Sequence, residues 1–373
     1  MIPYGKQSIN QDDIDAVVNV LKSDWLTTGP AVEKFESDLQ QFTGGVPVVS
    51  VSSGTAALHC AYVAAGIGPG DEVITPPLTF IATQATAVFC GAKIVFCDVQ
   101  WDTGNIDPNL IEGKITSRTK AIVAVDYAGH PADLDEIRKI CEKYKLIFIE
   151  DASHALGSKY KGKYVGSIAD ITTFSFFPTK NITTGEGGAV ACRDHQMLLK
   201  AKRFSRQGLI REKKQFMITT EGPWHQEIHE LGLNYRLPDI LAALGSSQLN
   251  RLSLFQKKRK EIFEFYSAQF KNDSRIITPT KKNTVEPFWH LYPLRVPADQ
   301  RLKIYNSLKA NKINAQVNYF PIHRQPVFSS GANDTDFPNA VNYYHCELSL
   351  PIYIELSKNE LKNVTEIVLN SLD

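Results

Sequence analysis

The sequence has almost no net charge. Its 41 lysines and arginines are balanced by 40 aspartates and glutamates, which leaves a formal charge of +1 at pH 7. Binding to nucleic acid or to an anionic membrane by bulk electrostatics requires a basic excess that this chain does not have. We therefore expect no nucleic-acid and no membrane partner, and any anion must be bound by a local site.

Long hydrophobic runs and paired cysteines are also missing. No apolar stretch approaches the roughly 18 residues that a membrane-spanning helix needs, and residues 1–13 lack the apolar core of a secretory signal. The six cysteines form no C-x-x-C pair, and most lie in apolar runs, so we interpret them as buried reduced thiols. These features favour a cytoplasmic protein with neither a disulfide framework nor a metal site.

Short β-rich runs recur along the first half of the chain. Several are nearly continuous in Val, Ile and Phe, which is typical of strands buried on both faces of a sheet. The runs are 46–52, 72–77, 93–99, 120–127, 146–151, 171–177 and 187–193. Helix-like segments at 55–66, 79–90 and 133–145 lie between the earlier runs, which predicts an α/β fold with a mainly parallel, helix-covered, seven-stranded sheet. No helix separates the last two runs, so part of the sheet should be antiparallel or irregular.

The character of the chain changes near residue 235. A long helical stretch, 238–271, leads into a more polar third with scattered short strands such as 291–296. We interpret residues 1–245 as a large domain and residues 246–373 as a smaller α+β C-terminal domain. The N-terminal segment, although it is counted with the large domain, could pack on the small domain.

Ser53, Gly54 and Thr55 join a predicted strand to a predicted helix. A helix N-terminus presents free N–H groups and a partial positive charge, and glycine lets the backbone approach an anion closely. Serine and threonine hydroxyls add hydrogen-bond donors. The segment is thus a candidate phosphate cradle, although the same residues also suit a simple helix N-cap.

Asp151 ends the strand IFIED and is followed by Ala152, Ser153 and His154. In open α/β sheets, ligands bind at the carboxyl ends of the strands. A carboxylate there is costly to bury unless it faces a cation or a polar site, and the protonated ring nitrogen of a cofactor would serve. His154 is placed to pack on such a cofactor, or it has a structural role only.

Lys180 lies between two predicted strands, in the segment SFFPTKNITTGEGG at 175–188. Its flanks are apolar and rich in glycine and threonine rather than charged, which favours a covalent cofactor lysine over a solvated loop lysine. The glycine-rich segment at 66–70 follows a helix and precedes a strand, the reverse of the dinucleotide-binding order, and no P-loop motif occurs. A Rossmann oxidoreductase is therefore disfavoured.

Taken in order, these segments resemble the DegT/DnrJ/EryC1/StrS family of sugar aminotransferases, which are fold-type I enzymes that use pyridoxal 5′-phosphate (PLP). The resemblance extends over essentially the whole chain. It is carried by WLTTGP (25–30), SSGTAAL (52–58), TPPLTFIAT (75–83), EDASHALGS (150–158), SFFPTKNITTGEGG (175–188) and GLNYRLPDI (232–240).

The resemblance implies a role for individual residues. Lys180 matches the lysine that forms the Schiff base with PLP, and Asp151 matches the partner of the pyridinium nitrogen. The predicted phosphate contacts are Gly54, Thr55 and Ser175, with Ser53 beside them. Phe80 matches an aromatic that stacks on the ring, and Asn234 resembles a phosphate contact contributed by the other subunit of a homodimer. Two positions depart from the common pattern: His154 stands where many members have Gln, and Phe177 where many have His.

Within the family, the stretches VDYAGHPADL (125–134), HLYPL (290–294) and AQVNYFPIH (315–323) are similar to enzymes of pseudaminic acid biosynthesis. That subgroup implies transfer of an amino group from L-glutamate to C4 of a UDP-linked 2-acetamido-2,6-dideoxy-4-ketohexose. Candidate substrate contacts are Thr28, Glu186, Tyr319 and His323, and for Tyr319 and His323 a purely structural role is equally consistent with the sequence.

Three alternatives stay open beside this prediction. The substrate could be another nucleotide 4-keto or 3-keto sugar, linked to dTDP or GDP. Some relatives are PLP-dependent sugar dehydratases in which His replaces the Schiff-base lysine, and Lys180 favours transamination over that chemistry. A catalytically inactive regulatory homologue should have lost the lysine or the aspartate, and both Lys180 and Asp151 are present.

Overall fold

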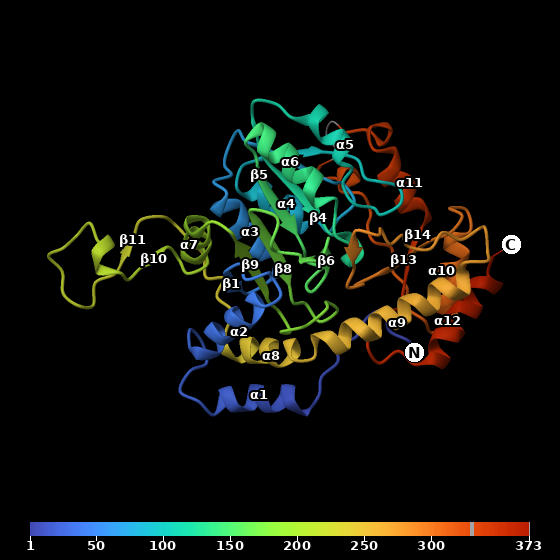
Figure 1. Cartoon of the computed structure of the whole chain (residues 1–373), viewed down its shortest axis with the longest axis horizontal. Coiled ribbons are helices and arrows are strands. Elements are labelled where there is room, and N and C mark those ends of the chain that lie inside the picture. The colour runs from blue at the N-terminus through green and yellow to red at the C-terminus, as the bar shows by residue number, and fades with distance from the viewer. Residues whose placement is uncertain (329–331, 373) are drawn as a thin grey trace.

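A computed structural model of the chain describes residues 1–328 and 332–372. A seven-stranded sheet with the strand order β1-β9-β8-β5-β4-β2-β3 lies at the centre of the large domain (Figure 1). Its strands are β1 (Val48–Val51), β2 (Glu72–Thr75), β3 (Lys93–Phe96), β4 (Thr119–Val125), β5 (Ile147–Asp151), β8 (Ile171–Ser175) and β9 (Gly188–Cys192). Each overlaps one of the seven runs predicted as strands, so that prediction is confirmed.

The strand directions also follow the prediction. Neighbouring strands from β3 through β2, β4 and β5 to β8 are parallel, whereas β9 runs antiparallel to both β8 and β1. The β8–β9 connection lacks a crossover helix, and an antiparallel pair is the arrangement that such a connection allows. The loop between these two strands carries Lys180.

Helices cover both faces of the sheet. Successive residues of a strand point to opposite faces, so in β2 Val73 packs with α3, α4 and α7, and Ile74 packs on the other face with α6. Another group of apolar side chains on that second face joins α2 to β8 and β9. These helices are α2 (Pro30–Gln40), α3 (Gly54–Ala64), α4 (Ala82–Phe89), α6 (Leu134–Tyr144) and α7 (His195–Phe204). The burial of both faces explains the nearly continuous apolar runs.

The C-terminal unit has a core of its own. Side chains such as Phe270, Tyr292 and Val364 form it, and Ile2 of the N-terminal segment packs into the same cluster. The Ile2 backbone N–H donates to the Lys312 carbonyl at 2.8 Å, so the N-terminal segment is anchored on this unit. Its elements are α9 (Leu252–Phe270), α10 (Arg301–Ala310), α11 (Pro338–Cys346), α12 (Lys358–Asn370), β13 (Tyr292–Arg295) and β14 (Glu347–Leu350). A domain boundary near residue 245 stays a prediction.

The helical stretch expected at 238–271 is divided in two. α8 (Asp239–Leu249) ends before Arg251, whose φ of −107° and ψ of 7° are not helical, and α9 begins at Leu252. The Arg251 guanidinium forms an ion pair with the buried Asp13 of α1 (Gln11–Leu21), and α1 packs along α8. The break therefore depends on a tertiary contact that the local pattern does not reveal.

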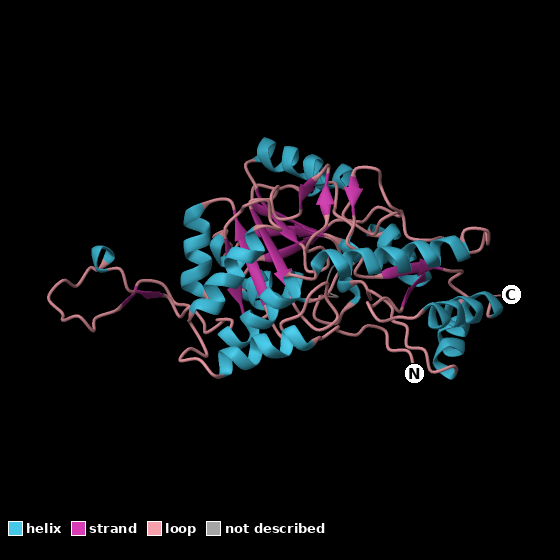
Figure 2. Ribbon diagram, turned by 60° about the horizontal axis from the view of Figure 1, so that its bottom comes forward, coloured by secondary structure: helices cyan, strands magenta, loops and turns pink. Residues whose placement is uncertain are grey.

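An extended arm leaves the body between α7 and α8, at the left of Figure 1 and again in Figure 2. It contains the short pair β10 (Leu209–Ile210) and β11 (Glu227–Ile228), and its Met217, Trp224 and Leu231 side chains are 80%, 78% and 90% exposed. Apart from short 3-10 turns, the remaining elements of the described residues are α5 (Pro108–Ile111), β6 (Lys159–Tyr160), β7 (Lys163–Tyr164) and β12 (Val285–Glu286). No helix within the described ranges is long and apolar enough to cross a membrane.

Candidate active site

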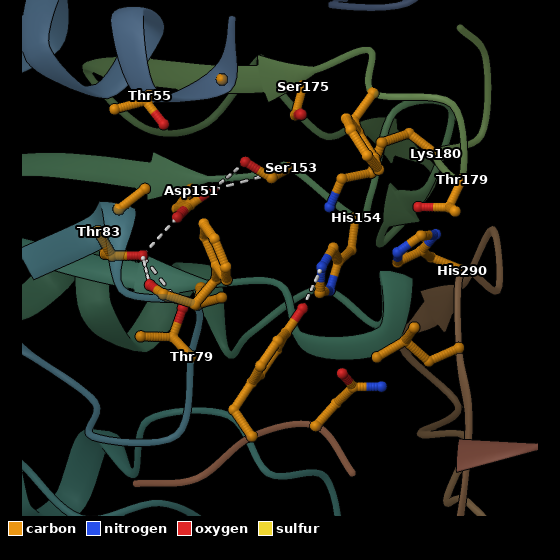
Figure 3. A pocket seen from close by; sticks show the side chains of 18 of the residues that line it. Thr55, Thr79, Thr83, Asp151, Ser153, His154, Ser175, Thr179, Lys180 and His290 are labelled. Carbon is orange, nitrogen blue, oxygen red and sulfur yellow. Dashed lines mark hydrogen bonds between the residues drawn. The ribbon is translucent and has the colours of Figure 1, made fainter. Parts of the chain in front are cut away.

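A cavity of about 540 Å³ opens at the carboxyl edge of the sheet (Figure 3). Val125, Asp151 and Ser175, the last residues of β4, β5 and β8, all line it. α3 begins at the same edge and contributes Gly54 and Thr55. This is the edge at which ligands of open α/β sheets bind.

Asp151 is held in place by two side-chain hydroxyls. Thr83 Oγ1 donates to Asp151 Oδ2 at 2.8 Å, and Ser153 Oγ donates to Asp151 Oδ1 at 2.6 Å. The carboxylate is buried and borders the cavity, and among the described residues no Lys, Arg or His forms an ion pair with it. A buried carboxylate without a cationic partner fits the protonated ring nitrogen of a cofactor.

The N-terminus of α3 forms the N-cap that its sequence allows and is compatible with the phosphate cradle, which stays a prediction. Ser53 is the N-cap, since its hydroxyl accepts the Ala56 N–H at 3.0 Å. Gly54 has no room for a side chain, because an added Cβ would lie 2.8 Å from Cβ and 2.9 Å from Oγ of Ser175. The Ser175 hydroxyl can therefore lie against the first turn of the helix, where free N–H groups are available. This cradle fits a phosphate group.

Lys180 enters the cavity from the β8–β9 loop. Burial lowers the pKa of its amine to about 8, although the Asp151 carboxylate acts in the opposite direction. The next residue anchors this loop: Asn181 Nδ2 donates to the carbonyl oxygens of His154, Leu156 and Phe288 at 3.2, 3.2 and 3.3 Å. A lysine with a lowered pKa on a fixed loop is suited to form a covalent bond and to transfer protons.

Two histidines border the cavity next to the lysine. The ring centroids of His154 and His290 are 4.3 Å apart, and both residues are buried. Burial lowers the pKa of each well below the usual histidine value, and the Lys180 charge adds to the effect. Nδ1 of each ring is buried without a hydrogen-bond partner. Both rings are thus neutral, and each has polar capacity left for a ligand.

Phe80 and Glu186 are exposed side chains at the cavity. Phe80 precedes α4, is 58% exposed, and its ring centroid lies 6.2 Å from that of Tyr319. An exposed aromatic ring over a cavity is suited to stack on a flat ligand. The expected stacking role of Phe80 and substrate contact of Glu186 are consistent with these positions and stay predictions.

Three expected site residues lie elsewhere in this chain. Thr28 and Asn234 are exposed and are not among the residues that line the cavity. His323 is buried against Phe96 and Phe337, and its Nε2 lies 3.1 Å from Asp334 Oδ1. The structure thus gives His323 an aromatic environment outside the cavity, whereas Thr28 and Asn234 would need a second chain to reach a site.

The structure also brings in residues that the sequence did not single out. Tyr4, Gln316 and Asn318 line the cavity from the C-terminal side together with Tyr319 and His290. The motifs HLYPL and AQVNYFPIH pointed to the right segments, but no local pattern indicated which side chains face the site. Within the described part of the chain, no group of three or more His, Cys, Asp or Glu is arranged to hold a metal ion.

Comparison with known proteins agrees with this geometry. The profile of the DegT/DnrJ/EryC1/StrS aminotransferase family matches residues 7–369. A UDP-4-amino-4,6-dideoxy-N-acetyl-beta-L-altrosamine transaminase of Campylobacter jejuni is 38% identical over 379 residues, covering 100% of this chain and 98% of that protein. A GDP-perosamine synthase of Escherichia coli O157:H7 is 34% identical over 370 residues, covering 98% and 97%.

Solved structures agree as well. Helicobacter pylori PseC, an aminotransferase involved in the biosynthesis of pseudoaminic acid, superimposes with a TM-score of 0.91 at 34% identity, covering 99% of this chain and 98% of that one. The PLP form of Spr1654 from Streptococcus pneumoniae superimposes with a TM-score of 0.92 at 32% identity, covering both chains completely. These likenesses extend over the whole length of the chain.

Proposed function

The chain belongs to the DegT/DnrJ/EryC1/StrS aminotransferase family, and we propose that it aminates C4 of a UDP-linked 2-acetamido-2,6-dideoxy-4-ketohexose with L-glutamate as the donor. The product is a UDP-4-amino-4,6-dideoxy sugar for pseudaminic acid biosynthesis. The observation that carries the chemistry is the placement of the Lys180 amine and the Asp151 carboxylate around one cavity at the sheet edge. The names of the Campylobacter and Helicobacter relatives support the choice of sugar.

The enzyme is a PLP-dependent aminotransferase of sugars. Bound PLP supplies a sink for the electrons of a substrate C–H bond. Asp151 holds a proton on the ring nitrogen, which strengthens that sink, and Thr83 and Ser153 keep its carboxylate oriented. Gly54, Thr55 and Ser175 would hold the phosphate at the N-terminus of α3.

Lys180 has the proton-transfer role. Because burial lowers the pKa of its amine to about 8, a substantial fraction is neutral near physiological pH. A neutral Nζ can accept the proton from Cα of the amino donor and return a proton to the sugar carbon that becomes C–NH₂. Donor and acceptor use one site in turn, so we expect ping-pong kinetics.

A homodimer would complete the site. The arm between α7 and α8 exposes Met217, Trp224 and Leu231, and large apolar side chains gathered on a projecting segment are typical of a protein contact. Thr28 and Asn234 are exposed outside this chain's cavity, so the proposal assigns their contacts to the site of a second copy. Sedimentation of the purified protein as a monomer at micromolar concentration would oppose this part of the proposal.

The second candidate is amination of a GDP- or dTDP-linked keto sugar, which the similarity to GDP-perosamine synthase favours. The test offers L-glutamate with UDP-, GDP- and dTDP-linked 4-keto sugars and measures 2-oxoglutarate and the amino sugar. We expect turnover with the UDP-linked 2-acetamido sugar. Turnover restricted to a GDP or dTDP sugar would contradict the proposed substrate. A protein that loads PLP but transfers no amino group from any donor would favour a regulatory homologue.

A further inference from the structure

Asn318, which lines the cavity, is held from several sides. Its backbone N–H donates to Glu347 Oε2 at 2.7 Å, and its carbonyl accepts a hydrogen bond from the Tyr127 hydroxyl. Its side-chain Nδ2 donates to Tyr4 Oη at 2.7 Å and to Ser349 Oγ at 3.0 Å. We call Tyr4, Tyr127, Glu347 and Ser349 the Asn318 clamp. The clamp joins the N-terminal segment, the large domain and β14.

Glu347 is the ionisable carboxyl of this clamp and is fully buried at the start of β14. Besides the Asn318 N–H, it accepts a hydrogen bond from the Ser349 hydroxyl. Burial raises its pKa to about 8, with Arg301 acting in the opposite direction. The phenols of Tyr4, Tyr127 and Tyr343 also interact with its charge. Burial of a carboxyl group lowers protein stability unless hydrogen bonds compensate for the lost hydration. Because Glu347 accepts a hydrogen bond from Asn318, a residue of the cavity, we infer that it has a role beyond packing.

Tyr319 follows Asn318 directly and reaches a predicted site residue. Its hydroxyl lies 3.1 Å from His154 Nε2, and the two rings are nearly parallel, at 23°, with centroids 6.2 Å apart. Burial raises the pKa of Tyr319 above its ordinary value and lowers that of His154 well below its ordinary value. The phenol therefore keeps its proton and the imidazole is neutral, so the tautomer of His154 decides which of the two groups donates the hydrogen bond between them.

A neutral imidazole carries one proton on one of its two nitrogens. If Tyr319 donates to Nε2, that nitrogen must be the acceptor, so the ring proton of His154 resides on Nδ1. This Nδ1 is buried without a partner in the protein. The contact with Tyr319 thus holds the orientation of the ring, and with Tyr319 as the donor it also sets the tautomer that the ring presents beside Lys180.

We propose that Glu347 is a positioning residue, which acts through Asn318 to hold Tyr319 in hydrogen-bonding contact with His154 and thereby sets the tautomer of that histidine. Glu347 does not line the cavity, so it acts on the site through the Asn318 N–H that it accepts. The inference deepens the proposed function because it assumes that His154 belongs to the active site. It does not depend on which sugar is aminated.

Two substitutions at Glu347 separate positioning from packing. Glu347→Gln keeps an oxygen that accepts the Asn318 N–H, and its amide NH₂ can donate to Ser349 Oγ. Glu347→Leu fills a similar volume but leaves the buried Asn318 N–H without an acceptor. Tyr319→Phe removes the donor to His154 directly. Val364→Ala, in the core of the C-terminal unit and away from the clamp, is the control for lost stability alone.

The direct readout is nitrogen-15 NMR of histidine-labelled apoprotein, with His154→Gln used to assign the His154 signals. In the wild type and in Glu347→Gln, we expect protonated Nδ1 and unprotonated Nε2. Glu347→Leu and Tyr319→Phe should both move His154 toward a mixture of tautomers, and Val364→Ala should not. An unchanged His154 in Glu347→Leu would overturn the proposal, as would an equal change in Val364→Ala. If Glu347→Leu does not fold, Tyr127→Phe replaces it, because this variant removes the hydrogen bond to the Asn318 carbonyl. A shift of His154 toward a mixture of tautomers in Tyr127→Phe would then support the proposal, and an unchanged His154 would overturn it.

Kinetics provide a second readout. Misplacement of a site group by about 1 Å can cost up to about a hundredfold in rate, so we expect Glu347→Leu and Tyr319→Phe each to slow the L-glutamate half-reaction roughly tenfold. The double variant should be no slower than either single variant, because both break the same contact. Additive losses would contradict action through Tyr319. The NMR result stands even if none of the tested sugars is a substrate, so failure of the inference and failure of the proposed function are distinguishable.

Discussion

The cavity has two walls of different construction. The sheet wall consists of Gly54, Thr55, Asp151, His154 and Ser175, which lie at or shortly after the ends of β1, β5 and β8. The C-terminal wall consists of His290, Gln316, Asn318 and Tyr319, together with Tyr4 from the other end of the chain. Side chains of the sheet wall are fixed by the strands that carry them, whereas the C-terminal wall depends on contacts between distant segments such as the Asn318 clamp.

This difference suggests a division of labour. The sheet wall holds the groups that we propose bind the cofactor, and its geometry is set by backbone that is buried on both faces of the sheet. The C-terminal wall offers neutral polar groups and aromatic rings, which suit recognition of a sugar nucleotide. Changes at the sheet wall should therefore abolish chemistry or cofactor binding. Changes at the C-terminal wall should alter substrate affinity, except where they act on His154, as Tyr319→Phe does, and slow the reaction moderately.

The largest effect is expected at Lys180, where the two walls meet. Lys180→Ala removes the group that we propose transfers protons, and loss of a general acid–base costs about a hundredfold to ten-thousandfold. We expect transamination to fall roughly ten-thousandfold in a folded protein, measured as 2-oxoglutarate release from L-glutamate. The control is Lys163→Ala, an exposed lysine of β7. Full activity in Lys180→Ala would show that transamination does not require Lys180.

The pH dependence of cofactor capture is the next largest effect. Because burial lowers the pKa of Lys180 to about 8, its amine is protonated below that pH and neutral above it. Only the neutral amine attacks an aldehyde, so the rate at which apoprotein captures PLP should fall about tenfold per pH unit below 8 and level off above it. Stopped-flow absorbance measures this rate. A midpoint near 10.4, the pKa of an unperturbed lysine, would show that burial in the cavity does not lower the pKa of Lys180.

Gly54→Ala tests the phosphate cradle of the sheet wall. An added Cβ would lie 2.8 Å from the Ser175 side chain, and overpacking of this kind costs about 1–3 kcal/mol. We expect PLP to bind roughly tenfold more weakly, as about 1.4 kcal/mol corresponds to a factor of ten. Gly68→Ala is the matched control, because an added Cβ there meets no atom within 4 Å. Equal PLP affinity in both variants would argue against phosphate binding at α3.

The smallest effect is expected at the C-terminal wall. Tyr4→Phe removes the oxygen that accepts the 2.7 Å hydrogen bond from Asn318 Nδ2. A neutral hydrogen bond contributes about 1 kcal/mol, so we expect roughly a fivefold rise in KM for the sugar nucleotide and unchanged PLP affinity. Initial rates and a PLP titration separate the two quantities. A loss of PLP affinity as large as that of Gly54→Ala would show that the walls do not divide their tasks.

The same difference explains how much could be predicted from the sequence. Gly54, Asp151 and Ser175 each stand at or near a strand end beside local signals of strand, turn and helix. The mainly parallel seven-stranded sheet was predicted correctly, whereas its last part was expected only to be antiparallel or irregular. His290 and Asn318 have no comparable signal, since their place in the cavity depends on contacts between distant segments. The His290 N–H donates to the Ala128 carbonyl, and the Tyr127 hydroxyl donates to the Asn318 carbonyl. His323 lies only four residues beyond Tyr319, yet it faces Phe96 and Phe337 instead of the cavity. The break between α8 and α9 likewise depends on Asp13, more than two hundred residues away.

The attachment of PLP to Lys180 is the central claim, and chemical trapping tests it most directly. The PLP-loaded protein is reduced with sodium borohydride, digested, and analysed by tandem mass spectrometry. The account predicts a phosphopyridoxyl group on Lys180, in the peptide that contains Thr179 and Asn181. A modified lysine elsewhere in the chain, or the absence of any modified lysine in a yellow, PLP-loaded protein, would contradict it.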